Sequence, residues 1–500
     1  MPLPDFAAFS AGLAAGQGQV LWRERVADLD TPVGVFLKLA AGKPNSFLLE
    51  SVEGGAARGR YSAVGMEPDL IWRCRDGRAE LNRHAQAAPH AFEPAEGTAL
   101  DSLRATLAAT QMTLPAGLPP IAVGLFGYLG YDMVRLMETL PALKPDVLGM
   151  PDAVLMRPTL MAVFDHVRDA LSLFTTVWPV PGLDPQAAWD SAQARLDEAE
   201  AALDRPLPRP AAPVSLPKPP EPSSNFTREG FIAAVETAKE YIRAGDCFQI
   251  VPSQRFSAPF ALPPFALYRA LRRINPAPFL FFFDFSGFAA VGASPEILVR
   301  LRDGEVTIRP LAGTRRRGAT PEEDKALEVE LLADPKERAE HLMLLDLGRN
   351  DIGRVSAIGS VQVTSQFQIE RYSQVMHIGS EVRGRLRPGL SALEALAGGF
   401  PAGTLTGAPK VRAMAIIEEL EPSRRGPYAG GFGYFGADGG MDTCIGLRTA
   451  LVKDGVMYVQ AGAGVVADSD PVAEYEETHQ KARALFRAAE EAVRFAAGRR

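Results

Sequence analysis

The chain has 500 residues, enough for two or three domain-sized units. A hydrophobic content of 47% supports a large core, and a net charge of −7 with both signs mixed excludes a strongly basic nucleic-acid surface. No basic region precedes the first apolar residues, and the most apolar stretch, Phe279 to Val291, is interrupted by Asp284. We therefore expect neither a signal peptide nor a membrane span. Three isolated cysteines, Cys74, Cys247 and Cys444, indicate reduced core thiols in a cytoplasmic protein.

The first part of the chain contains several short apolar runs between Gly, Pro and Asp clusters. Such runs predict strands, and they are VGVFLKL (33–39), SFLLES (46–51), IAVGLFGYLGY (121–131), TLMAVFDH (159–166) and LSLFTTVW (171–178). Trp189, Leu196 and Leu203 then recur every seven residues, which predicts an amphipathic helix. Residues 206–222 carry eight prolines and indicate an extended linker. We accordingly expect a domain at 1–205, a linker at 206–225 and a second domain at 226–490.

Beyond the linker, helix and strand patterns segregate instead of alternating. A capped helix is expected at Thr227–Ala244, and a long helix is expected to start at Pro471. Strands are expected at 248–256, 278–285, 288–291, 297–301, 306–309, 431–435, 444–452 and 456–461, and helices at 322–346, 392–397 and 410–419. This order favours an α+β fold, with large antiparallel sheets packed against outer helices, over a parallel α/β sheet.

Two pairs of glutamates occur in the same local setting, far apart in the chain. Glu337 and Glu340, like Glu474 and Glu477, follow an Asp-Pro dipeptide, which is a strong helix start. Residues three apart share a helix face, so each pair presents two carboxylates on one side. Two facing pairs would repel unless a hard cation such as Mg²⁺ lay between them. The alternative is two acidic first turns that are merely favoured by the helix dipole.

Further polar groups are of the kinds that a small anionic substrate needs. Glu296 lies beside apolar strands, where desolvation would raise its pKa and suit it to general-acid catalysis. Arg448, within a strand, suits bidentate carboxylate binding, and the glycine-rich turn at 460–465 could form an anion nest. A Gly/Thr turn at 401–410 opens a helix, and His377 has apolar flanks typical of a core histidine. Each signal alone is weak.

Together and in this order, these segments resemble the chorismate-utilising enzymes. The resemblance covers about residues 226–490, and its most specific stretches are LAGTRRRG (311–318), KERAEHLMLLDLGRNDIGRV (336–355), PAGTLTGAPKVRAM (401–414) and QAGAGVVADSDPVAEYEET (460–478). The region before the linker resembles the N-terminal domain of anthranilate synthase component I, with Leu48-Leu49-Glu50-Ser51 as its marker.

Two positions separate the chemistries within this family. Isochorismate and salicylate synthases carry a water-activating lysine where this chain has Gln249, and aminodeoxychorismate synthases typically carry a nucleophilic lysine where it has Ala312. The resemblance therefore implies the anthranilate synthase reaction, in which ammonia attacks C2 of chorismate and pyruvate leaves. An aminodeoxychorismate synthase component I and a catalytically silent binder of tryptophan or Mg²⁺ remain as alternatives.

The resemblance also implies a role for each matching residue. Glu340 and Glu477 would bind Mg²⁺ directly, with Glu337 and Glu474 supporting them. Glu296 would protonate the departing 4-hydroxyl, His377 would assist proton removal from C2, and Thr404 would be a further catalytic residue close to the chorismate site. The substrate would be bound by Gly313, Thr314, Tyr428, Arg448, Gly462, Ala463 and Gly464.

Partners are implied in the same way. None of the three cysteines has the glycine-elbow context of a glutaminase nucleophile, so this chain is expected to lack the amidotransferase. Ammonia should come from a separate amidotransferase subunit, component II, which joins this chain in a heterotetramer. In the family, tryptophan inhibits from a site between the LLES segment and an N-P-x-P-Y-M segment. Here these contain Ser51 and, with Phe and Leu in place of Tyr and Met, Pro278, Phe279 and Leu280.

Overall fold

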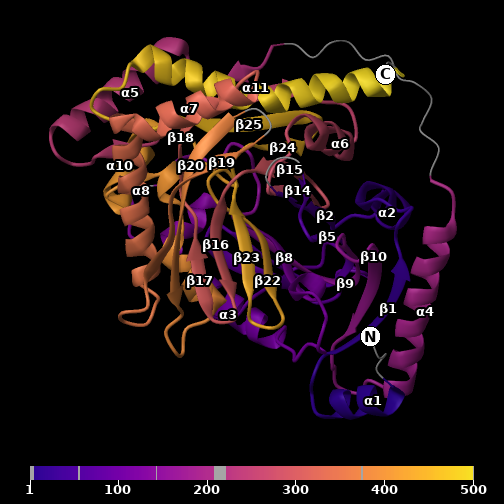
Figure 1. The fold of residues 1–500 in the computed structure, drawn as a ribbon. Helices are drawn as coiled ribbons and strands as arrows, with labels where there is room; N and C mark the ends of the chain where they lie inside the picture. The colour runs from indigo at the N-terminus through magenta and orange to yellow at the C-terminus, as the bar shows by residue number, and fades with distance from the viewer. Residues whose placement is uncertain (1–4, 54–56, 142, 208–220, 373–374, 499–500) are drawn as a thin grey trace.

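The structure, a computed structural model, describes residues 5–53, 57–141, 143–207, 221–372 and 375–498 (Figure 1). Its helices are α1 (Phe6–Ala14), α2 (Pro32–Leu39), α3 (Ala99–Ala109), α4 (Pro185–Asp204), α5 (Arg228–Arg243), α6 (Pro264–Ile274), α7 (Pro321–Ala333), α8 (Pro335–Gly353), α9 (Ala392–Gly399), α10 (Lys410–Leu420) and α11 (Pro471–Ala496). Three short 3₁₀ turns are η1 (Pro120–Ala122), η2 (Tyr131–Leu136) and η3 (Gly403–Leu405).

The described strands form one 21-stranded hydrogen-bonded network and two small two-stranded ladders. In the first part of the chain they are β1 (Gln19–Val26), β2 (Ser46–Glu50), β3 (Val52–Glu53), β4 (Ala57–Arg58), β5 (Tyr61–Arg75), β6 (Arg78–Asn82), β7 (Glu93–Pro94), β8 (Gly124–Leu129), β9 (Ala153–Asp165) and β10 (Ala170–Val177). In the second part they are β11 (Ser223–Ser224), β12 (Gln249–Ile250), β13 (Ser253–Pro259), β14 (Phe279–Asp284), β15 (Ala289–Ser294), β16 (Ile297–Arg302), β17 (Glu305–Ile308), β18 (Leu311–Arg316), β19 (Gln362–Arg371), β20 (Val375–Arg385), β21 (Gly407–Ala408), β22 (Gly431–Gly436), β23 (Met441–Ile445), β24 (Thr449–Lys453) and β25 (Val456–Gly462).

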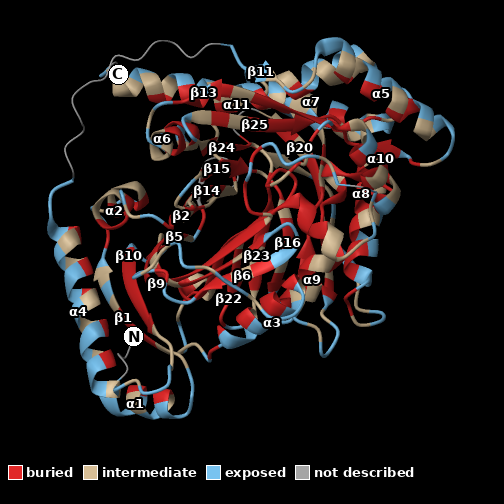
Figure 2. Ribbon diagram, turned by 180° about the vertical axis from the view of Figure 1, so that it is seen from behind, coloured by how far each residue is buried: buried red, intermediate tan, exposed pale blue. Residues whose placement is uncertain are grey.

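The two parts of the chain share their sheet. Strand β2 pairs antiparallel with β14, and β8 pairs antiparallel with β22. Every strand pairing within this network is antiparallel among the described residues, and helices cover its outside, so the predicted α+β class is confirmed (Figures 1 and 2). The predicted proline-rich linker falls largely on residues 208–220, which lie outside the described residues.

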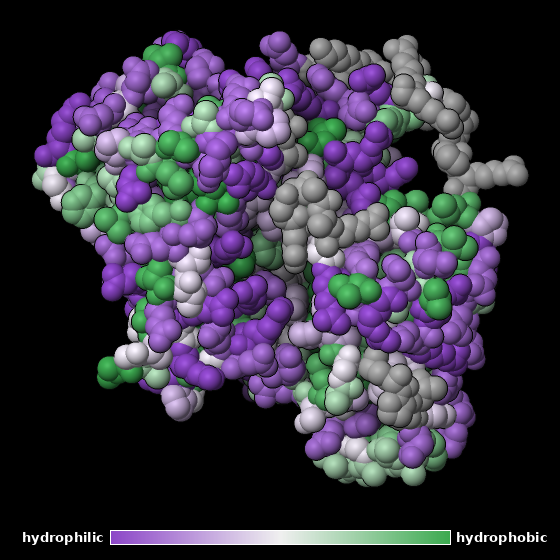
Figure 3. Space-filling view, in the orientation of Figure 1, coloured by the Kyte–Doolittle hydropathy of each residue, from purple (hydrophilic) through white to green (hydrophobic). Residues whose placement is uncertain are grey.

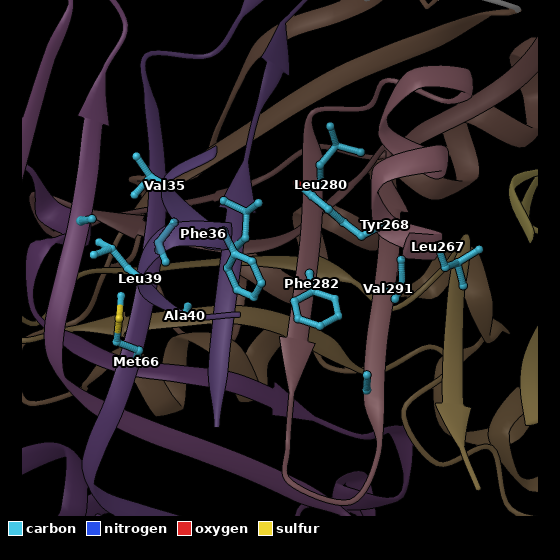
Figure 4. Close-up of a cluster of buried hydrophobic side chains, with 14 of the residues drawn as sticks. Val35, Phe36, Leu39, Ala40, Met66, Leu267, Tyr268, Leu280, Phe282 and Val291 are labelled. Atoms are coloured by element: carbon cyan, nitrogen blue, oxygen red, sulfur yellow. The ribbon is translucent and has the colours of Figure 1, made fainter. Parts of the chain in front are cut away.

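One predicted strand is wrong, because residues 32–39 form helix α2. Thr31 caps the helix by accepting a hydrogen bond from the Gly34 N–H at 3.0 Å, and Pro32 occupies its first turn. Phe36 then packs across the two parts: its ring is stacked on that of Phe265 at 4.2 Å between centroids. It also lies edge-on to Phe282 at 5.4 Å between centroids (Figure 4). The cap and proline are a helix start, and they outweigh the strand-like composition of the run.

Several predicted elements are each divided in two. The helix expected at 322–346 is two helices, α7 and α8, that meet at Asp334, since this residue ends one helix and caps the next before a proline. The strand expected at 444–452 is β23 and β24, separated at Arg448, whose φ is +50°. The long strands β5, β19 and β20 were not predicted.

The buried interior is continuous between the two parts. One apolar cluster contains Phe36 and Leu48 together with Phe282, Val291 and Leu485, and the central strands are the most buried elements (Figure 2). The face seen in Figure 3 is mostly hydrophilic, with hydrophobic residues gathered around α8 and α10. No helix among the described residues is long and apolar enough to cross a membrane.

Candidate active site

Helices α8 and α11 begin as the Asp-Pro dipeptides predict. Asp334 Oδ1 accepts from the Lys336 N–H at 2.9 Å, and Asp470 Oδ1 accepts from the Ala473 N–H at 2.8 Å. Each cap holds the first turn in a defined direction. The glutamates in the first two turns of both helices consequently line one cavity, although about 130 residues separate the two pairs along the chain.

This cavity has a volume of about 1290 Å³. It is lined by most of the predicted site residues, namely Glu296, Gly313, Thr314, Glu337, Glu340, His377, Thr404, Tyr428, Arg448, Gly462, Gly464, Glu474 and Glu477. Ala463 does not line it, because its N–H donates to Pro252 O at 3.1 Å and its side chain is fully buried. Gln249 does line it, so the position that separates the family's chemistries faces the same space.

The four carboxylates repel one another and are partly compensated by neighbours. Burial raises the pKa of Glu340, and the charges of Glu337 and Glu477 raise it further. Gln249 Nε2 donates to Glu340 Oε1 at 3.0 Å. Lys481 Nζ lies 2.6 Å from Glu477 Oε1. The charge of Glu477 therefore acts on Glu340 across the cavity, which places the two helix starts face to face.

Arg315 compensates the remaining charge on the α8 side. Its guanidinium Nη1 lies 3.1 Å from Glu337 Oε1 and Nη2 lies 2.9 Å from Asp334 Oδ2, so it clamps the cap and the first turn together. Glu474 lies opposite; burial raises its pKa, while a hydrogen bond from Ser469 lowers it in part.

The donor set is chemically suited to Mg²⁺, since carboxylate oxygens are the ligands that this ion prefers. The raised pKa of Glu340 shows carboxylates close enough to oppose one another's ionisation. Within the part of the chain that the structure describes, no three acidic, imidazole or thiol groups are already gathered as ligands of one ion. The arrangement is that of compensated carboxylates facing a common space.

Glu296 also lines the cavity and is only 7% exposed. Burial raises its pKa to about 8, against weaker opposition from the hydrogen bonds of the Leu311 N–H and the Thr404 hydroxyl. The Thr404 hydroxyl lies 3.3 Å from both carboxyl oxygens. Glu296 is thus protonated at neutral pH and can act as a general acid, as the sequence predicts.

His377 is held by a bulge in the neighbouring strand. Gly313 adopts φ +63° where the register between β18 and β20 shifts, and its carbonyl oxygen lies 2.9 Å from His377 Nδ1. A carbonyl only accepts, so Nδ1 carries the proton and Nε2 keeps its lone pair. Burial lowers the pKa of His377, and the charges of Arg448 and Lys481 add to this effect. The imidazole is therefore neutral and can accept a proton.

A basic and phenolic pair closes another part of the cavity. Arg448 adopts φ +50°, a conformation uncommon outside glycine, which turns it out of the sheet between β23 and β24. Burial lowers its pKa, and Tyr428 and Glu477 offset part of that cost. Burial also raises the pKa of Tyr428 to about 12, so this residue remains a hydrogen-bond donor. An anionic substrate group fits against this pair.

The four residues expected to bind an inhibitor lie elsewhere, and none of them lines the cavity. The Val52 N–H, next to Ser51, donates to Ala277 O at 3.2 Å, which brings Ser51 beside Pro278. Leu280 pairs with Glu50 in the β2–β14 ladder, and Phe279 is the next residue. The two segments named by the sequence are thus neighbours in space, on strands that join the two parts of the chain.

Sequence reasoning missed Lys481 and Arg315. Lys481 Nζ also donates to Gly462 O at 2.8 Å, so it links α11 to the end of β25. Its position four residues after Glu477 is a recognisable ion-pair spacing. Arg315 lies within the LAGTRRRG stretch, but nothing in that run of arginines indicates which one reaches Glu337.

The comparisons agree with this geometry. The family model for chorismate binding enzymes matches residues 58–487, and the chain belongs to that family. A relative from Cereibacter sphaeroides named anthranilate synthase component 1 is 59% identical over 99% of both chains. One of the same name from Thermus thermophilus is 49% identical and covers 93% of this chain and 96% of its own.

Solved structures give the same picture of the fold. The crystal structure of anthranilate synthase component I from Streptococcus pneumoniae superimposes with a TM-score of 0.73 at 38% identity, covering 86% of this chain and 92% of that one. The menaquinone-specific isochorismate synthase MenF from Escherichia coli superimposes with a TM-score of 0.70 at 20% identity, covering 97% and 99%. The second likeness concerns the fold alone.

Glu296→Gln should change how stability depends on pH. The folded wild type keeps the Glu296 proton up to pH about 8, whereas an unfolded glutamate loses it near the ordinary pKa of 4.5. Wild-type stability should therefore fall as pH rises through this window, relative to Glu296→Gln, by roughly 5 kcal/mol in total. Denaturant unfolding at pH 5, 7 and 9 measures this difference, with the exposed Glu322→Gln as control. Parallel curves for wild type and Glu296→Gln would contradict the assignment.

Proposed function

We propose that this chain is the chorismate-binding subunit of an anthranilate synthase. It aminates chorismate at C2 with ammonia and then eliminates pyruvate to give anthranilate, the first step of tryptophan biosynthesis. The observation that carries the proposal is the acid–base pair that lines the cavity, a protonated carboxyl at Glu296 and a neutral imidazole at His377. The relatives that match over nearly the whole chain bear the name of this enzyme.

Substrate binding uses the charged groups of the cavity wall. Arg448 and Tyr428 bind the enolpyruvyl carboxylate, because they supply a guanidinium and a phenolic donor from one place. The ring carboxylate lies toward Gly462 and Gly464, beside Lys481. Mg²⁺ held by Glu340 and Glu477, with Glu337 and Glu474 in support, would neutralise that ring carboxylate when bound.

The proton transfers are divided between Glu296 and His377. Ammonia bonds to C2 while the ring double bonds shift and the C4–O bond breaks, and Glu296 gives its proton to the oxygen, which leaves as water. His377 Nε2 then accepts the C2 proton as the C3–O bond breaks and the ring becomes aromatic. The enolpyruvyl group takes up a proton and leaves as pyruvate. Thr404 keeps Glu296 directed at the substrate.

Gln249 supports ammonia over water as the nucleophile. Its amide has no useful basicity, so it cannot deprotonate water. Its Nε2 is occupied by Glu340, and its Oε1 has no hydrogen-bond partner among the described residues. That carbonyl oxygen is an acceptor for an N–H group of the incoming ammonia.

The chain depends on a partner for its ammonia. Its three cysteines are buried, and burial raises the pKa of Cys74 to about 12 and that of Cys247 to about 11, so neither is an activated thiolate. Cys444 is also buried, which again raises its pKa. A glutaminase subunit, component II, would supply ammonia within a heterotetramer.

The two parts of the chain divide the work between them. All residues that line the cavity follow position 226, so residues 226–490 form the catalytic part, and residues 1–205 form the regulatory part. Tryptophan binds between Ser51 and the Pro278–Leu280 segment, outside the cavity. Binding of tryptophan there would act on the catalytic part through the paired strands β2 and β14, which join the two parts.

The purified chain should form anthranilate from chorismate, Mg²⁺ and ammonium, but not from glutamine. The product's fluorescence reports the reaction, and high ammonium at alkaline pH should favour it because free ammonia is the nucleophile. With saturating free ammonia, the rate should fall as pH rises above about 8, where Glu296 loses its proton. Formation of 4-amino-4-deoxychorismate instead, or sustained turnover with glutamine alone, would contradict the proposal.

Ser51→Phe should weaken inhibition by tryptophan without changing the uninhibited rate. The larger side chain would fill the space between β2 and the residues before β14, which lie outside the cavity. Tryptophan titrations of the ammonium-dependent rate compare the variant with wild type, and the exposed Val26→Phe provides a matched control. Equal inhibition of Ser51→Phe and wild type would place the inhibitor site elsewhere.

A further inference from the structure

Arg425 has no role in the mechanism above, yet its side chain joins separate walls of the cavity. It lies in the turn between α10 and β22 and is 2% exposed. Its Nη1 donates to Leu405 O at 2.7 Å, and its Nη2 donates to Val251 O at 2.7 Å. One planar guanidinium thus bonds to two backbone carbonyls that come from distant parts of the sequence.

Both carbonyls belong to segments that carry site residues. Leu405 follows Thr404, whose hydroxyl contacts the Glu296 carboxyl. Val251 follows Gln249 by two residues, and Gln249 donates to Glu340. Arg425 therefore links the turn that carries Thr404 to the segment that carries Gln249.

Aromatic rings fix the plane of the same guanidinium. Its central carbon lies 5.5 Å from the ring centroid of Tyr428, a cavity residue, and 4.8 Å from that of Tyr131 in η2. The Tyr131 N–H also donates to Gly426 O at 2.8 Å, which anchors the turn to the first part of the chain. Stacking restricts rotation of the guanidinium, so its donors have fixed directions.

A buried acid balances the charge. Glu421 and Arg425 form an ion pair at 2.7 Å with side chains 4% and 2% exposed. Glu421 Oε1 also accepts from the Ser253 N–H at 2.8 Å, next to the Val251 segment. Such a pair is a poor device for stability alone, because desolvation cancels much of its attraction. The two backbone carbonyls that Arg425 bonds, Leu405 O and Val251 O, both belong to residues that line the cavity, which indicates a role in shaping the site.

We propose that Arg425 is a positioning residue for the reaction, holding the Thr404 turn, the Gln249–Val251 segment and Tyr428 at the separation that the substrate requires. This inference rests on the proposed function. It adds that the relative position of acid and nucleophile is set by a side chain that touches neither the substrate nor the reacting groups.

The test is Arg425→Lys, which keeps the charge but not the planar fork. We expect kcat with saturating ammonia to fall between about 10- and 100-fold, because small misplacements of reacting groups have effects of this size. The Thr404 hydroxyl stabilises the ionised form of Glu296, so its displacement should also move the alkaline limb of the kcat–pH profile to higher pH.

Arg157→Lys is the matched control. Arg157 is also buried, bonds to a carboxylate through two nitrogens at 2.9 and 2.8 Å, and lies 4.3 Å from the Trp178 ring, but it does not line the cavity. It should lose thermal stability while keeping wild-type kcat, KM and pH profile. If Arg425→Lys behaves in the same way, Arg425 is merely structural and the proposal is overturned.

A second variant controls for the possibility that Arg425→Lys fails to fold. Arg425→Gln combined with Glu421→Gln removes both buried charges together, so no unpaired charge remains, and it should show the same loss of kcat. Wild-type kcat and pH profile in this double variant would also overturn the proposal. The pH window over which stability depends on Glu296 needs no substrate, and it should move upward in both variants. That readout tests the positioning role separately from the proposed reaction.

Discussion

The arrangement of the site depends on four carboxylates that two helix starts direct into one space. Burial and the charges of neighbouring glutamates raise the pKa values of Glu340 and Glu474. The chain offsets this cost with Arg315, Lys481 and the Gln249 amide, each bonded to a different glutamate. The compensation is incomplete, and it leaves a cavity wall suited to a hard cation and, through it, to an anionic ring.

Two other residues that line the cavity have the complementary property. Glu296 is kept protonated by burial, and His377 is kept neutral by burial and by two neighbouring cations. An acid and a base that are both uncharged at neutral pH can act on one dianion in turn without a net charge in the interior. The bulge at Gly313 is what makes this possible, because it turns a backbone carbonyl toward Nδ1 and leaves Nε2 free.

Local sequence patterns predicted the helix starts and the acid of the site. Contacts between distant segments explain the site residues that the sequence analysis missed. The two Asp-Pro helix starts and the raised pKa of Glu296 follow from neighbours in the chain, and both are confirmed. The strand expected at 33–39 is helix α2, because a Thr cap and a Pro decide the backbone before composition does. Lys481 and Arg315 act through contacts that the chain makes only once β18, β25 and the helices have packed.

We propose that these carboxylates repel each other until Mg²⁺ binds between them. Thermal unfolding with and without Mg²⁺ tests it most directly, using Glu340→Gln and, as a control, Glu229→Gln in the exposed first turn of α5. Without metal, Glu340→Gln should melt no lower than wild type, because the substitution removes a charge that burial disfavours. At Mg²⁺ a hundredfold above its dissociation constant, wild type and Glu229→Gln should each gain about 2.7 kcal/mol, and Glu340→Gln almost none. If Glu340→Gln is destabilised without metal and still gains as much from Mg²⁺ as wild type, the claim is contradicted.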